Sequence, residues 1–443
     1  MVKVIPFKGF RYDESVVGEL SKVVAPPYDV MKGSKLDMVQ ALSPNNIAWV
    51  TKNKPQDDDT QENNQYSRAR DILNGLIAEG MLKEEDTESF YVYGQNFTVH
   101  GKDHFRFGFI GLLELEEFAS SSSSDEAFSG VLQHEETLPK DIEDRLNLSR
   151  NTLAQFGQIF VIYPDHEKSV DTILEKSMAA EPLMDVVDHQ QVKHRLWKIS
   201  DPVDVAQITD LMKNKYLIIA DGHHRYKTAL ALNKERGDLA GSRYRMLTFV
   251  NMANTGLVIL PTHRLVQNLE VFEKEDLLAK LRNNFTVLPF KTQDEMFGEM
   301  NTAFEHGRHA LGLYMNDGNY YSLTLNNIEV MKGILPDRSV ESQELDVSIL
   351  HAMVLDGILG IDKTKLAQGT MKGGGYVVYI KGIGDAVDEA IGQVNEGAQA
   401  VFFMNPTRIE EVEAVATNFE SMPQKSTFFY PKVWTGFTIN LIK

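Results

Sequence analysis

The stretch of the sequence with the densest functional groups is DGHHR, at residues 221–225. The apolar run at residues 216–220 predicts a buried strand, and the pattern after the stretch predicts a helix. Gly222 at the junction suits a tight turn and a close approach by a ligand. The start of a helix exposes free N–H groups at the positive end of its dipole. With the guanidinium group of Arg225 beside them, these groups predict a phosphate-binding site.

Other readings of the same turn remain open. His223 and His224 would be further hydrogen-bond donors, and Asp221 could hold Mg²⁺ or orient a donor. Alternatively, the stretch is an ordinary strand–helix junction, capped by Asp221 and carrying exposed histidines. A transition-metal site is a lesser alternative, because adjacent histidines on such a turn diverge and cannot easily bind one ion.

A second dense stretch is VLQHEETLPKDIEDRLNLSR, at residues 131–150, which contains His134, Glu135 and Arg145. A carboxylate near phosphate-binding groups can act as a general base toward a hydroxyl, or it can hold a metal ion. The alternative is an exposed charged helix with ion pairs four residues apart, such as Asp141 with Arg145. The residues alone do not decide between the two.

Three shorter stretches combine polar groups with apolar segments. APPYDV, at residues 25–30, has two prolines that stiffen the backbone, and a rigid turn is the preferred interpretation. His263 and Arg264 end an apolar strand-like run, where α/β proteins often gather site residues. Lys425 precedes two hydroxyl residues and suits phosphate, but the P-loop spacing is absent and a surface turn remains the alternative.

Composition limits the classes of partner. The chain has 443 residues, no cysteine and a formal net charge of −18, from 63 acidic against 45 basic residues. The acidic balance argues against nucleic acid as a partner, and the missing cysteine excludes thiolate chemistry and disulfides. No apolar run has the length of a signal peptide or a membrane span. We therefore expect a cytoplasmic protein without a membrane partner; its oligomeric state is open, with a homodimer as the candidate.

The order of expected elements indicates an α+β, or mixed α/β, fold with mixed sheets. Strand-like runs alternate with helical patterns, and ALGLYMNDGNYYSLTL predicts a hairpin around residues 317–318. The serine-rich stretch at residues 118–130 predicts a solvated loop. We place domain boundaries near residues 190 and 270, which gives an N-terminal α/β domain (1–190), a phosphate-binding core (191–270) and a C-terminal α/β domain (271–443).

Six motifs together carry a resemblance to a known family: APPYDV, HEETLPKDIEDRLNLSR, IADGHHRYKTA, LPTHRL, ELDVSILH and MPQKSTFFYPK. They resemble the family described as domain of unknown function 1015, over nearly the whole chain, and that family name carries no activity. The DGHHR turn is also similar to the phosphate-binding turn of the ParB and sulfiredoxin superfamily, nearest to the D-G-H-x-R turn of free serine kinases. This shorter resemblance covers roughly residues 190–240 and implies a ParB/sulfiredoxin-like nucleotide-binding core.

The resemblance implies specific roles. Sulfiredoxins carry a catalytic cysteine where His223 stands, so the cysteine-free chain cannot share their chemistry. ParB-type proteins add DNA-binding helices and a basic surface, neither of which is visible here. The free serine kinases imply that Asp221, His223 and Arg225 bind the phosphates of ATP or ADP, with His224 at the variable position. They also use a glutamate as base, and Glu135 is our candidate for that role.

The leading hypothesis is a nucleotide-dependent kinase that phosphorylates a small hydroxylated metabolite, with L-serine as the first candidate. Gly222 to Arg225 would hold the phosphates, Asp221 would bind Mg²⁺ or orient a neighbouring histidine, and Glu135 would accept the proton. A non-catalytic nucleotide-binding switch of ParB-like type is the main alternative, and a metal-dependent hydrolase is the lesser one. The candidates for substrate binding are His134, Arg145, His263, Arg264 and Lys425.

Overall fold

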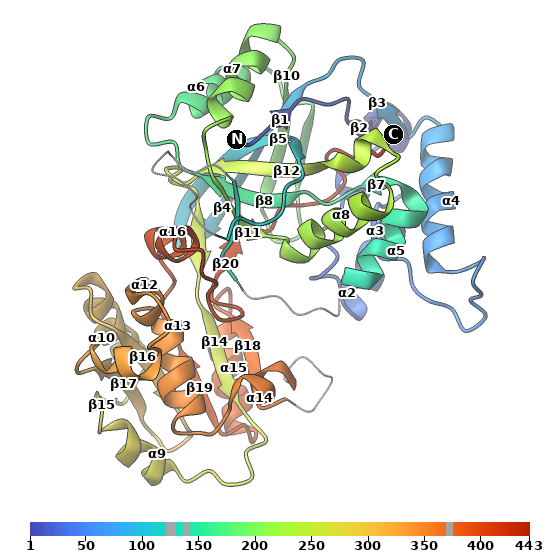
Figure 1. Ribbon diagram of the computed structural model, residues 1–443. Coiled ribbons are helices and arrows are strands. Elements are labelled where there is room, and N and C mark those ends of the chain that lie inside the picture. Colours follow the sequence, from blue (N-terminus) through green and yellow to red (C-terminus); the bar gives the residue numbers. More distant parts are fainter. Residues whose placement is uncertain (121–129, 136–141, 369–374) are drawn as a thin grey trace. The chain divides into compact units, whose positions relative to one another are not determined.

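The computed structural model describes residues 1–120, 130–135, 142–368 and 375–443 (Figure 1). Contacts between these residues define two compact units. Unit 1 comprises Met1–Gln133, Thr137–Val258 and Pro431–Lys443, and unit 2 comprises His134–Glu136 and Ile259–Tyr430, in each case for the described residues. The chain therefore leaves unit 1, builds unit 2, and then returns to unit 1.

Unit 1 contains most of the secondary structure of the first 258 residues. Its strands are β1 (Val4–Ile5), β2 (Phe10–Tyr12), β3 (Leu82–Glu84), β4 (Phe90–Val99), β5 (Lys102–Glu114), β6 (Val131–Gln133), β7 (Ala154–Gln155), β8 (Ile159–Tyr163), β9 (Met184–Val187), β10 (Lys193–Ile199), β11 (Leu217–Asp221), β12 (Tyr244–Asn251) and β21 (Asn440–Leu441). Its helices are α1 (Glu14–Val17), η1 (Leu20–Lys22), α2 (Ser34–Ala41), α3 (Ala48–Thr51), α4 (Gln65–Ala78), α5 (Ile142–Thr152), α6 (Ser169–Ser177), α7 (Pro202–Met212), α8 (His223–Glu235) and η3 (Ala240–Arg243).

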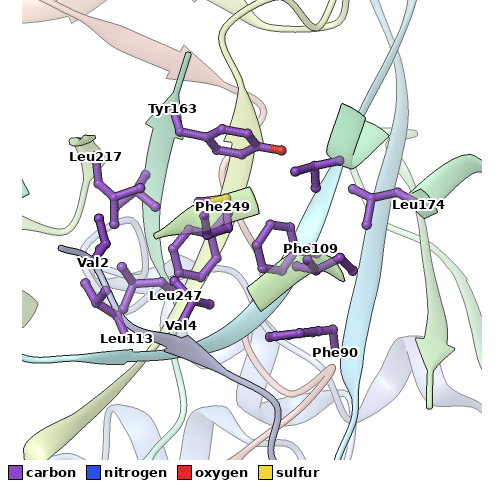
Figure 2. Packing of buried hydrophobic residues seen from close by; sticks show 14 of the residues in the cluster. Val2, Val4, Phe90, Phe109, Leu113, Tyr163, Leu174, Leu217, Leu247 and Phe249 are labelled. Carbon is purple, nitrogen blue, oxygen red and sulfur yellow. The ribbon is translucent and has the colours of Figure 1, made fainter. Parts of the chain in front are cut away.

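The main sheet of unit 1 has nine strands and is mixed. Its order is β6-β11-β8-β12-β5-β4-β10-β9, and β1 also pairs with β5. The pairs β11–β6 and β12–β8 are parallel, whereas the pair β11–β8 is antiparallel. Its core is rich in aromatic and aliphatic side chains; the rings of Phe109 and Phe249 stack with centroids 4.7 Å apart (Figure 2). Because β11 has a paired neighbour on each side, the end of this strand that carries Asp221 is held in place.

Unit 2 is built from the segment between residues 259 and 430. Its strands are β14 (Thr262–Val266), β15 (Phe285–Phe290), β16 (Ala310–Tyr314), β17 (Tyr320–Leu325), β18 (Val377–Lys381), β19 (Ala400–Phe403) and β20 (Phe428–Tyr430), and β13 (Val258–Leu260) begins one residue earlier. Its helices are α9 (Lys274–Leu281), α10 (Gln293–Glu305), α11 (Val330–Ile334), α12 (Val340–Gln343), α13 (Asp346–Ile349), the π-helix η4 (Leu350–Asp356), α14 (Lys363–Gln368), α15 (Ala386–Asn395) and α16 (Ile409–Thr417).

The sheet of unit 2 has six strands in the order β15-β17-β16-β19-β14-β18, and its described pairs are antiparallel. The hairpin predicted around residues 317–318 is confirmed, since β16 pairs with β17 and Gly318 has φ 82°. Leu265, Met296 and Phe403 belong to the apolar core of this unit. Strand β14, which carries His263 and Arg264, lies between β19 and β18 and is fixed from both sides.

The structure bears on four of the sequence predictions: the fold class, the domain boundaries, the serine-rich loop and the membrane span. The mixed α/β fold with mixed sheets is confirmed. Contacts between the described residues divide the chain at residue 258 and again at residue 430, and strand β10 pairs with β4 across residue 190. The domain boundaries near residues 190 and 270 stay a prediction. Residues 121–129 of the predicted serine-rich loop lie outside the described residues. Among the described helices, none combines the length and the apolar character that a membrane span requires.

Candidate functional site

The strand–helix turn at residues 221–225 forms as predicted. Strand β11 is buried up to Ala220, and helix α8 begins at His223. Gly222 adopts φ 103° and ψ 26°, a backbone conformation that residues with a side chain rarely adopt. A Cβ atom at this position would lie 2.9–3.0 Å from the guanidinium group of Arg225. Gly222 thus supplies the turn and also leaves room for the arginine to fold back over it.

Asp221 forms the centre of an ion-pair cluster. Its Oδ2 lies 2.6 Å from Nη2 of Arg225, and its Oδ1 lies 2.7 Å from Nζ of Lys432. Burial alone would raise the pKa of Asp221, but the charges of Lys432 and then Arg225 outweigh it and hold the pKa below its ordinary value. Arg225 also donates to the backbone oxygen of Gln158. Asp221 is therefore an ionised carboxylate that positions two cations.

Lys432 is held in unit 1 by the backbone of its own segment. Gln95 Nε2 on β4 donates to the backbone oxygen of Lys432 at 3.0 Å, and Arg106 on β5 donates to the backbone oxygen of Pro431. Gln95 and Arg106 are 1% and 2% exposed. Because two buried side chains fix the carbonyl groups, the Lys432 side chain reaches Asp221 from a rigid backbone.

A pocket of about 60 Å³ opens beside this cluster, entirely within unit 1. Three arginines line it, Arg145, Arg225 and Arg245, and the described lining contains no Asp, Glu or His. Such a lining selects for an anion, because guanidinium groups are the side chains best suited to phosphate and carboxylate oxygens. The polar groups and ring that complete the lining come from Tyr28, Thr51, Ser149, Gln155, Thr228, Ser242 and Thr435.

Arg145 reaches the pocket from α5. This helix packs on α8 through a small apolar cluster that includes Leu146 and Leu232. The guanidinium group of Arg145 donates to both the Asp144 carboxylate, at 2.5 and 2.9 Å, and the backbone oxygen of Thr51, at 2.7 Å. Its carbon Cζ lies 4.2 Å from the centroid of the Tyr28 ring. The APPYDV and DRLNLSR motifs thus meet the DGHHR motif at one pocket.

Arg245 has the fewest hydrogen-bond and ion-pair partners of the three arginines among the described residues. It is 8% exposed, and its one hydrogen bond among the described residues runs from Nη2 to the backbone oxygen of Gly157, at 2.6 Å. Its buried Nε has no hydrogen-bond partner there, and no described carboxylate lies within ion-pair distance. Burial and then the charge of Arg225 lower the pKa of Arg245 to about 9. A buried cation without a counter-charge is costly, and a bound anion would offset that cost.

The remaining residues of the turn lie close to these groups. His223 is buried at the first position of α8, and His224 is partly exposed, with its backbone oxygen accepting a hydrogen bond from Thr228 at 2.8 Å. Gly222 precedes both residues at the start of the helix. The predicted phosphate-binding residues therefore sit at the strand–helix junction, and Arg225 reaches the pocket lining.

The other predicted site residues belong to unit 2, where they form a second cluster. His134 Nε2 lies 2.8 Å from the Thr427 hydroxyl, and Glu135 forms a β-bridge with Met422. Arg264 donates to the backbone oxygen of Lys425 at 3.0 Å. The charge of Glu135 counters part of the lowering that burial imposes on the pKa of Arg264. His134 and Glu135 thus lie with the LPTHRL and QKST motifs in unit 2.

His263 and Lys425 differ in their surroundings. His263 is 2% exposed, and its Nδ1 accepts a hydrogen bond from the Met404 backbone at 3.1 Å. Burial and then the charge of Arg264 lower the pKa of His263 to about 4, which keeps the ring neutral near pH 7. Lys425 is exposed and has φ 58°. Of the two, Lys425 presents its side chain to solvent.

Sequence reasoning missed Arg245 and passed over Lys432 and Tyr28. Arg245 is the second residue of a largely apolar strand, and a charged residue there was the available signal. Lys432 lies in the MPQKSTFFYPK motif, but Lys425 of the same motif was chosen as the candidate binding residue. The role of Tyr28 depends on Arg145, which is far away in the chain, so the Pro-Pro motif alone could not reveal it.

The oxygen and nitrogen donors of the described residues bear on whether the protein could hold a metal ion. Among the described residues no group of three His, Asp or Glu side chains could hold a metal ion. Both carboxylate oxygens of Asp221 are engaged, one with Arg225 and one with Lys432. In this arrangement Asp221 does not fit the role of a magnesium ligand, and we assign it the positioning of the two cations.

The fold is that of a mixed α/β protein, and its unit 1 contains an arginine-lined pocket. The chain belongs to the family described as protein of unknown function (DUF1015), whose profile matches residues 4–348. The family predicted from the motifs is thereby confirmed. Among curated proteins, none matches this sequence.

Several solved structures are similar to this chain at low identity. A free serine kinase in complex with AMP has 12% identity and a TM-score of 0.33, over 71% of this chain and 88% of that one. A conserved hypothetical protein from Pyrococcus furiosus has 12% identity and a TM-score of 0.31, over 68% and 89%. SbnI with a C-terminal truncation, from Staphylococcus aureus, has 13% identity and a TM-score of 0.32, over 70% and 84%.

Proposed function

We propose that the arginine pocket of unit 1 binds the phosphates of a nucleotide, ATP or ADP, and that the protein transfers the terminal phosphoryl group to a small hydroxylated metabolite. L-serine is the leading acceptor. The observation that carries nucleotide binding is Arg245, a buried cation without a carboxylate partner among the described residues, which lines one pocket with Arg145 and Arg225. The DGHHR turn adds its helix N-terminus to the same neighbourhood.

Charge and size indicate how such a ligand would bind. Arg145, Arg225, Arg245 and Lys432 are four cations, and the carboxylates that pair with them are Asp144 and Asp221. The positive excess matches a phosphate group. The cavity of about 60 Å³ opens to solvent, so a phosphate held by the arginines could carry a larger group outside it.

In the transfer step, the acceptor oxygen forms a bond to the terminal phosphorus as the bond from that phosphorus to the leaving nucleotide breaks. Arg225 and Arg245 would stabilise the charge on the phosphoryl oxygens, and Asp221 would keep Arg225 and Lys432 in place. The hydroxyl proton would pass to a base, and Glu135 is the candidate that the sequence offers for that role; it belongs to unit 2. Arg145 would meet a phosphate or the acceptor carboxylate. Since the described residues offer no all-protein metal site, no step is assigned to Mg²⁺.

The test is to incubate the protein with L-serine and either ATP or ADP, with and without Mg²⁺, and to follow O-phosphoserine by mass spectrometry. We expect Glu135→Gln to lower turnover by about a hundredfold or more while nucleotide affinity stays near wild type. Glu143→Gln, an exposed glutamate on α5, is the matched control and should change neither. Turnover that survives Glu135→Gln would remove Glu135 as the base.

A non-catalytic nucleotide-binding switch is the second candidate. The observation in its favour is that the described lining of the arginine pocket contains no carboxylate or histidine that could accept a proton. Tight nucleotide binding, lost in an Arg245 variant, together with no phosphorylation of L-serine or other small alcohols, would establish this function in place of the kinase.

A further inference from the structure

Unit 2 contains a second cavity, of about 180 Å³, with a different chemical character. Its apolar lining includes Leu335, Ala352 and Ile361. Ala352 belongs to the π-helix η4, a rare form of helix that often marks functional positions. The cavity is lined by unit 2 residues alone, so it stands independently of the nucleotide-binding proposal.

His351, the neighbour of Ala352, presents a fixed hydrogen-bond donor to this cavity. Nε of Arg264 lies 3.3 Å from Nε2 of His351. Because a guanidinium group can only donate, Nε2 must accept, and the ring proton must sit on Nδ1. Burial and then the charge of Arg264 hold the pKa of His351 well below its ordinary value, which keeps this neutral form. Arg264 thus sets the tautomer of His351.

Two hydroxyl groups accompany this donor. Ser348 on α13 and Tyr379 on β18 also line the cavity. The Nδ1 of His351 and both hydroxyl groups have no hydrogen-bond partner among the described residues. Three donors that face one mostly apolar cavity are the pattern of a small-molecule site, in which a few polar groups orient an apolar ligand.

Charged groups also border the cavity. Arg338 and Lys363 line the cavity with one carboxylate, Asp356. Arg338 also lies 3.8 Å from the Glu420 carboxylate, a loose ion pair. The hydrogen-bond donors suit a ligand oxygen that carries negative charge, while the apolar walls suit a hydrocarbon body.

We propose that this cavity of unit 2 binds a small carboxylate with an apolar or aromatic body, its carboxylate accepting hydrogen bonds from His351 Nδ1, the Tyr379 hydroxyl and the Ser348 hydroxyl. The apolar body would pack against Leu335, Ala352 and Ile361. Neither the arginine pocket nor the kinase reaction takes part in this binding.

Benzoate is the probe, and its binding to the full chain can be measured by saturation-transfer NMR and calorimetry. We expect millimolar affinity for benzoate and at least about tenfold weaker binding of benzyl alcohol, which lacks the charge. Ala352→Phe should fill the cavity and abolish binding. Ala179→Phe, at an exposed position of unit 1, is the matched control and should leave binding unchanged.

Variants of the donors test the polar half of the site. His351→Phe and Tyr379→Phe should each weaken benzoate binding by about tenfold, whereas His351→Gln, which keeps an N–H donor, should recover part of the loss. Tyr379→Phe removes one hydroxyl and keeps the ring, so it remains informative if His351→Phe fails to fold. Undetectable benzoate binding, equal affinity for benzyl alcohol, or unchanged binding in Ala352→Phe would overturn the proposal. Loss of binding in Arg245→Met would place benzoate in the arginine pocket and also overturn it.

Discussion

Each unit buries an arginine, and the two differ in how their donors are used. Arg264 in unit 2 is 1% exposed, and its guanidinium group donates a hydrogen bond to the ring of His351. It also donates to the backbone oxygens of Thr262, Gln424 and Lys425. Its carbon Cζ lies 5.3 Å from the centroid of the Tyr379 ring. Arg245 in unit 1 is 8% exposed and has a single hydrogen bond among the described residues.

This difference separates a structural arginine from a binding one. A guanidinium group whose donors meet carbonyl oxygens and a ring nitrogen of the same unit holds chain segments together and offers little to a ligand. A guanidinium group that is buried beside another cation, and has N–H donors without acceptors, raises the free energy of the ligand-free protein. A bound anion lowers that free energy again. Burial alone would rank the two residues alike, so the hydrogen bonds make the distinction.

The largest expected effect is on stability, in Arg264→Met. Removal of the guanidinium group leaves the carbonyl oxygens of the segment around Lys425 and the acceptor of His351 without a donor. We expect the free energy of opening unit 2 to fall by about 3 kcal/mol or more. Hydrogen exchange of the β14 and β19 amides measures it. Arg282→Met, at an exposed position of unit 2, should cost less than about 0.5 kcal/mol. Equal costs would mean that Arg264 is not structural.

The next effect is on binding, in Arg245→Met. We expect the affinity for phosphate or nucleotide to fall by about 1.5–3 kcal/mol, the contribution of a charge-assisted hydrogen bond. Stability should stay level or rise, because an apolar side chain replaces a buried charge. Calorimetric titration and urea unfolding measure the two quantities. Arg243→Met, an exposed arginine two residues earlier, is the control. A variant that loses stability and keeps its affinity would assign Arg245 to the structural class.

The smallest effect is a pH dependence of anion affinity. The pKa of Arg245 is lowered to about 9 in the empty pocket, and a bound anion would raise it. Below pH 9 the residue is charged in both states, so affinity should be flat there. Above pH 9 binding must take up a proton, and affinity should fall by up to about tenfold per pH unit. Sulfate is the probe because its charge is constant over this range. Arg245→Met should show no such fall, and a wild-type affinity that stays flat up to pH 10 would contradict the pKa argument.

Local patterns made part of the structure predictable. The turn at Gly222 and the hairpin at residues 310–325 follow from signals within about ten residues, and both form as predicted. The stretch around Arg225 was recognisable because strand, glycine and helix start are adjacent in the chain. Such features need no knowledge of distant segments.

The features that could not be predicted depend on contacts between segments far apart in the sequence. Arg245 differs from any other strand arginine only through Gly157 and Arg225, which lie elsewhere in the chain. The assignment of the motifs to the units depends on distant contacts too: APPYDV and DGHHR lie in unit 1, whereas LPTHRL and QKST lie in unit 2. The sequence holds no local mark at Pro431, where the chain re-enters unit 1, so this sorting could not be foreseen.

The return of the chain at Pro431 has a consequence for biosynthesis. Lys432, the second partner of Asp221, and Thr435, part of the pocket lining, are translated after the whole of unit 2. Strand β21, which pairs with β7, follows later still. A nascent chain that has reached Tyr430 carries every arginine of the pocket but leaves Asp221 with a single counter-charge. The arginine pocket is therefore completed only once the ribosome has passed unit 2, whichever unit folds first.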